Sequence, residues 1–242
     1  MIAVRHPLTD KIVPLDTQVI NNDSPLLGGH RVWLIVGRRG TGKSTLILNA
    51  LMKKESPYHK HYDNIYMISP SAKADPKFSD LVEELDSQGK FYEELSERTA
   101  KEILDKITAF NNGLSEKKRK KVHNLLILDD CAFMFPTSKK SVIHSIYING
   151  RHKKLTVCCI SQKYNLLPTV WRSQADMISM FPTESRQELE TLMNDLSCDK
   201  SYFEDVYKFA TDEPNSFLHI TLTHPIRYYK RFDEIQSKQN EE

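Results

Sequence analysis

A glycine-rich stretch near the start of the chain has the residue types and spacing of a phosphate-binding loop. "GRRGTGKS" runs from Gly37 to Ser44 and fits the pattern G-x-x-x-x-G-K-[ST]. It follows the apolar run "VWLIV" and precedes a segment with helical spacing. Gly37, Gly40 and Gly42 would let backbone N–H groups converge on phosphate oxygens, and the helix N-terminus would add partial positive charge. The placement between a strand and a helix favours this interpretation over a chance match in a glycine turn.

Two side chains at the end of this loop have predicted roles toward a nucleotide. Lys43 would reach the β- and γ-phosphates, and the Ser44 hydroxyl would ligate Mg²⁺. The sequence therefore predicts binding of ATP with its magnesium ion. Arg38 and Arg39 are not required by this chemistry; they are either contacts to an adjacent subunit or solvated charges.

A pair of carboxylates follows a second apolar run, in "NLLILDDCAF". A buried strand that ends in Asp129 places this carboxylate at the edge of the sheet where doubly wound folds bind ligands. We expect Asp129 to help hold Mg²⁺, directly or through water. Asp130 is placed to polarise an attacking water, although it would also suit a cap of the following turn.

The separation of the loop and the carboxylates indicates the branch of the fold. Lys43 and Asp129 are 86 residues apart, and a further strand candidate at 64–69 lies between them in the sequence. This spacing is typical of P-loop ATPases with an additional strand between the loop strand and the aspartate strand. It favours ATP hydrolysis that drives motion over the compact kinase and GTPase branch.

Two further polar residues are candidates for the same site. Gln162 comes just after the apolar run 155–161 and could bond the γ-phosphate and the attacking water, unless it simply begins a loop. Arg151 ends a helical stretch and could reach the nucleotide of a neighbouring subunit, or it could be a cation that interacts favourably with the dipole at the C-terminus of the helix. Arg172 and Arg186 are weaker candidates for this role in trans.

The elements that must position these residues are read from hydrophobic periodicity. Five apolar runs are predicted strands, at 32–36, 64–69, 124–129, 155–161 and 175–181. The intervals between them are too long for hairpins and have helical spacing, so we expect parallel crossovers. Near-continuous apolar strands imply burial on both faces, and hence three layers. Two helical stretches (184–196 and 200–210) and a hairpin within 216–232, turning near His224 and Pro225, follow.

The fold class is therefore α/β: a three-layer P-loop NTPase of the additional-strand, RecA-like branch. Its central sheet is expected to be mostly parallel, with a C-terminal β-hairpin. An N-terminal lead-in at 1–30, a single ATPase domain at 31–235 and a flexible tail at 236–242 complete the expected organisation.

Composition limits the partners and the compartment. The chain has 34 basic and 32 acidic residues and a net charge of +2, so any contact with DNA must come from a local patch. "EKKRKK" (116–121) is such a cluster, with a solvated loop as the plainer interpretation, and "IRYYKRF" is a second basic segment. The four cysteines lack metal-ligand spacing and suit an intracellular compartment. No apolar run approaches the roughly 20 residues of a membrane span.

The motifs in combination carry a family resemblance. With "GRRGTGKS", "LLILDDC", "NGRH" and "ISQ" in this order and spacing, the chain resembles the poxvirus-type genome-packaging ATPases of the FtsK/HerA superfamily. The resemblance covers roughly residues 30–182 and includes "LPTVWRSQADMISMF". It implies an oligomeric ring motor that uses ATP to translocate double-stranded DNA into a preformed capsid.

The resemblance also implies partners and residue roles. The partners would be double-stranded DNA, the other subunits of a homo-oligomeric ring, and capsid or vertex proteins, in the host cytoplasm, a viral factory or the virion. The nucleotide would be bound by the loop glycines and by Thr41, Lys43, Ser44 and Thr45. Asp129 would hold the metal, Asp130 would replace the glutamate that many relatives use as catalytic base, Gln162 would be the sensor, and Arg151 the finger candidate.

Other classes of P-loop protein lack their signatures in this chain. The guanine-reading motif N-K-x-D and the transporter motif L-S-G-G-Q do not occur, and the arginine-bearing lid of a small-molecule kinase cannot be located. Among motors, a DNA helicase or a conjugation-type DNA pump would use the same catalytic parts and is the alternative function.

Overall fold

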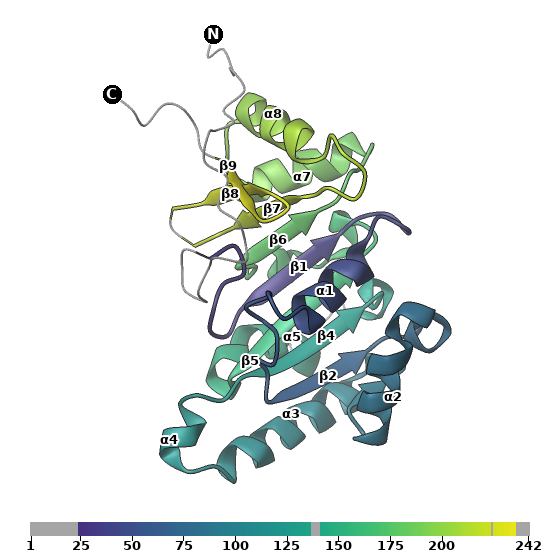
Figure 1. Cartoon of the computed structure of the whole chain (residues 1–242), viewed down its shortest axis with the longest axis vertical. Coiled ribbons are helices and arrows are strands. Elements are labelled where there is room, and N and C mark those ends of the chain that lie inside the picture. Colours follow the sequence, from purple (N-terminus) through teal and green to yellow (C-terminus); the bar gives the residue numbers. More distant parts are fainter. Residues whose placement is uncertain (1–23, 137–140, 224, 236–242) are drawn as a thin grey trace.

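One nine-stranded sheet organises the part of the chain that the computed structural model describes, namely residues 24–136, 141–223 and 225–235 (Figure 1). Its strand order is β3-β2-β4-β5-β1-β6-β7-β8-β9. Neighbours from β3 to β6 pair in parallel, and those from β6 to β9 pair antiparallel. The bounds are β1 (Val32–Val36), β2 (Asn64–Ile68), β3 (Phe91–Tyr92), β4 (Asn124–Asp129), β5 (Leu155–Ser161), β6 (Met177–Met180), β7 (Leu218–Thr221), β8 (Arg227–Lys230) and β9 (Asp233–Ile235).

The central strands are buried on both faces, as their unbroken apolar runs predict. Every residue of β1, β4 and β5 is buried. The strand between the loop strand β1 and the aspartate strand β4 is β5, whereas β2 lies on the far side of β4. The additional strand of this branch is thus contributed by residues 155–161, which come after Asp129 in the sequence, and not by the candidate at 64–69.

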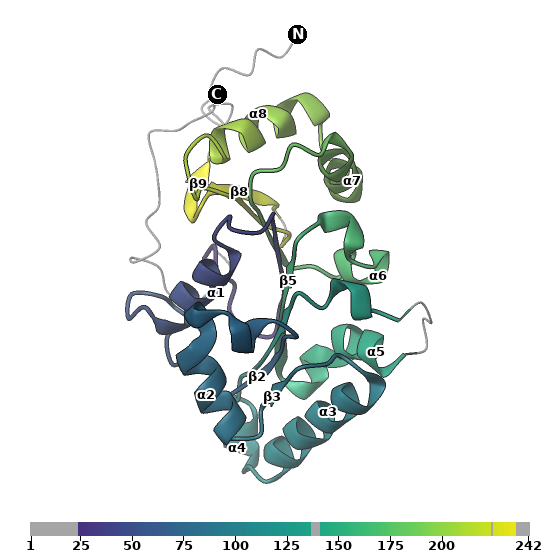
Figure 2. The same cartoon turned by 90° about the vertical axis from the view of Figure 1, so that its right-hand side faces the viewer.

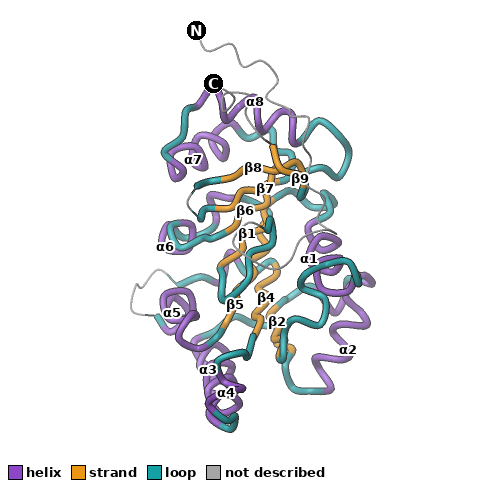
Figure 3. Tube along the Cα trace, turned by 60° about the vertical axis from the view of Figure 1, so that its left-hand side comes forward, coloured by secondary structure: helices purple, strands orange, loops and turns teal. Residues whose placement is uncertain are grey.

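Helices cover the sheet on both sides and complete the three layers (Figures 2 and 3). On one face α1 and α2 pack against the sheet, and on the other lie α3, α5 and α6. Within α1, Leu46, Ile47, Ala50 and Leu51 form the buried stripe that a period of 3.6 residues produces. The bounds are α1 (Lys43–Met52), α2 (Ser79–Ser87), α3 (Glu97–Asn112), α4 (Glu116–Arg119), α5 (Val142–Asn149), α6 (Thr169–Arg172), α7 (Arg186–Leu196) and α8 (Lys200–Ala210).

The C-terminal elements follow the predicted order. Helices α7 and α8 begin at N-caps whose side chains, Ser185 and Asp199, accept backbone N–H groups of the first turn. Strands β7 and β8 form the antiparallel hairpin expected within 216–232. Its turn at His224 lies outside the described residues. Strands β3 and β9 were not predicted, because two or three residues are too short to show a period.

The described part of the N-terminal lead-in packs into the domain. Residues 24–30 have no regular secondary structure, but Leu26 and Leu27 are fully buried in the same cluster as Trp33. The Tyr58 hydroxyl donates to the Leu27 carbonyl oxygen at 2.8 Å. Residues 1–23 and the predicted tail at 236–242 lie outside the description. Among the helices described, none has the length and apolar character that crossing a bilayer requires.

A buried chain of hydrogen bonds ties this lead-in to three strands. The Trp33 indole N–H donates to Ser179 Oγ at 2.9 Å, and the Ser179 hydroxyl bonds His219 Nδ1 at 2.8 Å. His219 Nε2 bonds the Pro25 carbonyl oxygen at 2.5 Å. Because His219 is fully buried, burial lowers its pKa from 6.5 to about 4, although the bond to Pro25 partly opposes this.

This imidazole makes the stability of the fold dependent on pH. Since the pKa of His219 is lower in the folded state, its stabilising effect is complete above pH 6.5 and is lost as the pH falls toward 4. The variant His219→Gln keeps a hydrogen-bond donor but does not titrate. We therefore expect its free energy of unfolding to fall less between pH 6.5 and 4 than that of the unsubstituted chain, and the difference should reach up to about 3 kcal/mol. Urea denaturation between pH 4 and 7 measures the difference.

The exposed His152 supplies the matched control, because His152→Gln should leave the pH dependence unchanged. Equal slopes for His219→Gln and the unsubstituted chain would show that the buried imidazole does not control acid stability.

Candidate active site

Loops that follow three neighbouring parallel strands meet at one edge of the sheet. The glycine loop follows β1, Asp130 follows β4, and Gln162 follows β5. The Gly37 N–H donates to the Ser161 carbonyl at 3.1 Å, and the Asp130 N–H donates to the Ile160 carbonyl at 3.2 Å. These bonds extend the strand ladders beyond the sheet by one residue. The predicted residues Lys43, Ser44, Asp129, Asp130 and Gln162 all line one cavity of about 500 Å³ here.

The glycines of the loop are required by its backbone and by its packing. Gly40 and Gly42 have φ of 83° and 107°, which is the left-handed region that side chains rarely adopt. A Cβ at Gly37 would lie 2.5 Å from Phe181 Cβ and 2.8 Å from Thr41 Oγ1. The Thr41 hydroxyl donates to the Arg38 carbonyl at 2.8 Å and closes the loop. The loop is thus a tight turn that keeps its backbone free of side chains on the inner surface.

The start of α1 provides the positive end of this cavity. The helix begins at Lys43, and no side chain caps its N-terminus, so the first N–H groups point into the loop. Lys43 Nζ donates to the Arg38 carbonyl at 2.8 Å. Burial lowers the pKa of Lys43, while Asp129 and Asp130 act to raise it. The cavity therefore combines an ammonium group, free N–H groups and two carboxylates, which is the donor set that a magnesium–triphosphate complex needs.

Asp129 is buried and receives a hydrogen bond that sequence reasoning missed. Ser69, the residue after β2, donates its hydroxyl to Asp129 Oδ2 at 2.8 Å. Burial raises the pKa of Asp129, the Ser69 bond lowers it, Asp130 raises it, and Lys43 lowers it. The only signal in the sequence was that the predicted strand 64–69 ends in a polar residue beside the aspartate strand.

Asp130 and Gln162 face each other across the cavity. Gln162 Nε2 donates to both Asp130 carboxylate oxygens, at 2.9 and 3.1 Å. Asp130 has φ of 54°, a left-handed conformation that Asp tolerates better than longer side chains. Its carboxylate points toward Gln162, and the turn that follows has no side-chain cap. The contact that the structure describes for this carboxylate is thus to Gln162, and the left-handed backbone suits a short side chain at this position.

Arg151 lies at the opposite edge of the sheet from this cavity. It belongs to the turn Gly150–Lys153, which precedes β5, and its guanidinium pairs with Asp176 Oδ1 at 2.9 Å. Asp176 in turn precedes β6 and bonds the N–H of Val32 at the start of β1. The side chain of Arg151 is 69% exposed. Arg151 therefore does not line the cavity of its own chain, and its pairing with Asp176 leaves open whether it acts in trans or serves as a cation at the helix end.

The weaker arginine candidates have other surroundings. Arg172 is mostly buried, with its guanidinium over the Tyr164 ring and near Asp195. Arg186, at the first position of α7, is exposed and pairs with Glu190. In the glycine loop, Arg38 pairs with Glu184 at 3.2 Å, and Arg39 lines the phosphate cavity.

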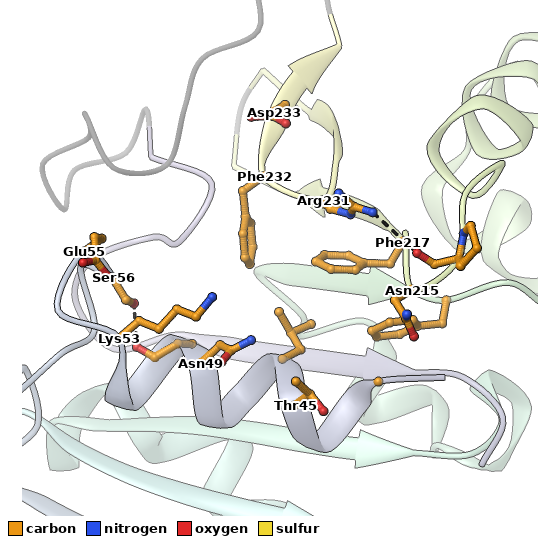
Figure 4. A pocket seen from close by; sticks show the side chains of 15 residues that line it. Thr45, Asn49, Lys53, Glu55, Ser56, Asn215, Phe217, Arg231, Phe232 and Asp233 are labelled. Atoms are coloured by element: carbon orange, nitrogen blue, oxygen red, sulfur yellow. Dashed lines mark hydrogen bonds between the residues drawn. The ribbon is translucent and has the colours of Figure 1, made fainter. Parts of the chain in front are cut away.

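A second cavity, of about 720 Å³, adjoins the first on the other side of the glycine loop (Figure 4). Gly42 lines both cavities. The exposed side of α1 forms its floor with Thr45, Asn49 and Lys53, and the C-terminal hairpin forms its roof. Thr45, expected at the phosphates, thus lines this second cavity.

The roof of this cavity is aromatic with polar groups at its rim. Phe217 packs against Phe181 and Phe232, with ring centroids 4.9 and 5.5 Å apart. Asn215 and Arg231 have φ of 58° and 56°, turns that place their side chains at the opening. An apolar slot next to a phosphate cavity has the dimensions and chemistry of a pocket for a flat heterocycle.

Comparisons with known proteins place the chain in a family. A family model described as "Poxvirus A32 protein" matches residues 25–209. "Uncharacterized protein 075L" of Invertebrate iridescent virus 6 is 26% identical over 184 residues, which cover 75% of this chain and 66% of that protein.

Solved structures share the fold. The genome packaging NTPase B204 from Sulfolobus turreted icosahedral virus 2 in complex with AMPPCP is 18% identical, with a TM-score of 0.53 over 84% of this chain and 98% of that one. The structure of B204 from Sulfolobus Turreted Icosahedral Virus, described as the DNA-packaging ATPase, is 20% identical, with a TM-score of 0.54 over 82% and 96%.

The bond from Ser69 makes a prediction about metal-nucleotide binding. Without this donor the pKa of Asp129 should rise, because burial then acts on a carboxylate with one hydrogen bond fewer. The pH below which Mg²⁺-ATP binding is lost should therefore move upward in Ser69→Ala, and Ser69→Thr should restore it. Calorimetric titration between pH 4.5 and 8 measures the shift. The exposed Ser79→Ala is the control, and a profile of Ser69→Ala identical to that of the unsubstituted chain would remove Ser69 from the site.

Proposed function

This chain belongs to the poxvirus A32 protein family, and from this premise we propose that it is an ATP-hydrolysing motor that translocates double-stranded viral DNA into a capsid. The observation that carries the proposal is the meeting of Lys43, Ser44, Asp129, Asp130 and Gln162 at one cavity. The B204 structures support it, since they are described as genome packaging NTPases in complex with AMPPCP and ATP-gammaS. We propose that this chain binds the same class of nucleotide and likewise packages a genome.

The chain's own residues provide the parts of a phosphoryl-transfer site. The loop N–H groups and Lys43 hold the phosphates and neutralise charge on the γ-phosphate oxygens. Ser44 and Asp129 supply the hard oxygen ligands that Mg²⁺ takes, and a bound ion would add further charge neutralisation. Asp130 would accept a proton from the attacking water, and Gln162, which lies beside Asp130, would bond that water and the γ-phosphate and so sense whether the γ-phosphate is present.

The nucleobase is assigned to the second cavity. A triphosphate held at the glycine loop has its base directed along α1, where Gly42 joins the two cavities. The Phe217 and Phe232 rings offer a stacking surface, and the Asn49 and Asn215 amides offer donors and acceptors for ring nitrogens.

The motor is proposed to be a homo-oligomeric ring that acts inside the host cell, in the cytoplasm or a viral factory, or on the virion. In this ring Arg151 would contact the nucleotide of the next subunit, because the cavity of the subunit that contains Arg151 lies at the other end of β1, about 16 Å away. Asp176 holds the guanidinium in place before a neighbour docks. Double-stranded DNA and capsid or vertex proteins are the proposed partners.

Mixing two inactive variants tests hydrolysis in trans. Lys43→Ala should lose phosphate binding and Arg151→Ala should lose charge neutralisation, so each should hydrolyse ATP poorly while staying folded. In an equal mixture about a quarter of the interfaces would join an intact Lys43 to an intact Arg151, and about that fraction of activity should return. Steady-state phosphate release, with and without linear duplex DNA, measures it.

Arg98→Ala is the matched control for the arginine substitution, because Arg98 is exposed on α3 and lines neither cavity. Turnover at the unsubstituted rate in Lys43→Ala would contradict the site assignment. Failure of rescue at every mixing ratio would contradict the trans role. Strand separation without net translocation would favour the helicase alternative.

Removing one ring tests the nucleobase cavity. Phe232→Ala should raise the KM for ATP about tenfold with little change in kcat, because stacking of a base is worth roughly 1–3 kcal/mol and is present in both ground and transition states. Phe110→Ala on α3 is the control substitution. An unchanged KM in Phe232→Ala would place the base elsewhere.

A further inference from the structure

Two basic segments lie side by side at the edge of the sheet opposite the nucleotide cavity. Residues 116–121, which include α4, lead into β4, and Lys153 and Lys154 lead into β5. The Asn124 N–H donates to the Lys154 carbonyl at 2.9 Å, and Asn111 Nδ2 donates to the Lys153 carbonyl at 2.9 Å. These bonds join the two segments into one surface, called here the basic edge (residues 116–121 and 153–154). Figure 1 shows α4 at the lower end of the molecule, far from α8.

The charge of the basic edge differs from that of the rest of the chain. Its eight residues comprise seven cations and one carboxylate, a net charge of +6, whereas the whole chain has +2. The remainder is therefore net acidic. A charge asymmetry of this kind orients the molecule toward a polyanion and repels it in other orientations.

Some side chains of the basic edge bond neighbouring groups and fix its backbone, whereas others are exposed to solvent. Arg119 Nε donates to the Asn111 carbonyl at 2.9 Å and thereby fastens α4 to the end of α3. Lys120 pairs with Glu116 at 3.0 Å. Lys117, Lys118 and Lys121 are exposed, and within the described residues they form no ion pair. Three cations thus project from a backbone that is fixed.

The composition of this surface does not resemble a protein interface. Interface cores are rich in aromatic residues and poor in lysine. Among the described residues, four large apolar side chains are more than a third exposed, and of these only Phe110 is on α3, the helix that α4 follows. Clustered lysines without sequence-reading polar groups are typical of contacts to phosphates.

We propose that the basic edge binds the phosphodiester backbone of duplex DNA without reading its sequence. This inference rests on the proposed function, which makes DNA the partner, and it adds the face that DNA contacts. Strand β4 then connects the DNA-binding segment, which precedes it, to Asp129 at its other end and to Asp130 just after it. Arg151 is a separate feature of this edge, since it is held by Asp176 beside β6.

Charge reversal at two free lysines tests the proposal. Lys117→Glu/Lys118→Glu should weaken binding of the full chain to a 30-base-pair duplex on the order of tenfold per lysine at 0.1 M salt. The slope of log affinity against log salt should become shallower by about 0.9 for each phosphate that the variant no longer neutralises. Fluorescence anisotropy over a salt series measures both quantities, and basal ATP hydrolysis without DNA should be unchanged.

Lys200→Glu/Lys208→Glu on α8 is the matched control, because it makes the same change in net charge at two exposed lysines far from α4. The proposal is overturned if both double variants lose affinity equally or if Lys117→Glu/Lys118→Glu binds DNA like the unsubstituted chain. Equal competition by polyglutamate at the same charge concentration would assign the surface to an acidic protein segment and would also overturn it.

The same preparations separate this inference from the proposed function. A chain that hydrolyses ATP but does not bind the duplex would refute the basic edge and leave the hydrolytic site standing. A chain that binds the duplex through Lys117 and Lys118 but does not hydrolyse ATP would refute the motor.

Discussion

The register of three parallel strands is the constraint on which the site depends. Val36 lies opposite Ser161, and Ile160 lies opposite Asp129, so β1, β5 and β4 end at the same level. A slip by one residue would exchange the side chains that pack against the helices of the two faces, so close packing on both faces fixes the register. The glycine loop, Asp130 and Gln162 consequently line one cavity, and Gln162 bonds Asp130, although up to 125 residues separate them in the chain.

The two edges of this sheet at which the parallel strands begin and end differ in chemistry, and the reason is their parallel topology. Parallel strands send all their carboxyl ends to one edge and all their amino ends to the other. The first edge holds the carboxylates, the ammonium of Lys43 and the free N–H groups of α1. The second holds the basic edge and the Arg151–Asp176 pair. In the proposed motor, nucleotide and duplex DNA would bind at opposite ends of the same strands and would not compete.

The antiparallel strands serve a different purpose. Strands β7 to β9 extend the sheet beyond β6 and bring Phe217 and Phe232 over α1 (Figure 4). The parallel core provides the phosphate cavity, and the C-terminal hairpin provides the roof of the adjoining one. The buried chain from Trp33 through Ser179 to His219 holds this addition to the loop strand, because each of its members lies on a different strand.

The sequence by itself determined the features that depend on local backbone chemistry. A glycine-rich loop between a strand and a helix directs backbone N–H groups toward an anion, and unbroken apolar runs indicate strands buried on both faces, so the loop, Asp129, Gln162 and the α/β class could be predicted. Only the tertiary structure decided which strands are neighbours, and therefore that β5 separates β1 from β4. Four further features could not be predicted from the sequence: the Ser69 bond to Asp129, the left-handed turn at Asp130, the aromatic cavity, and the place of Arg151 at the edge opposite the glycine loop. Each of these depends on contacts between segments far apart in the chain, and local periodicity contains no information about which distant segments will pack together.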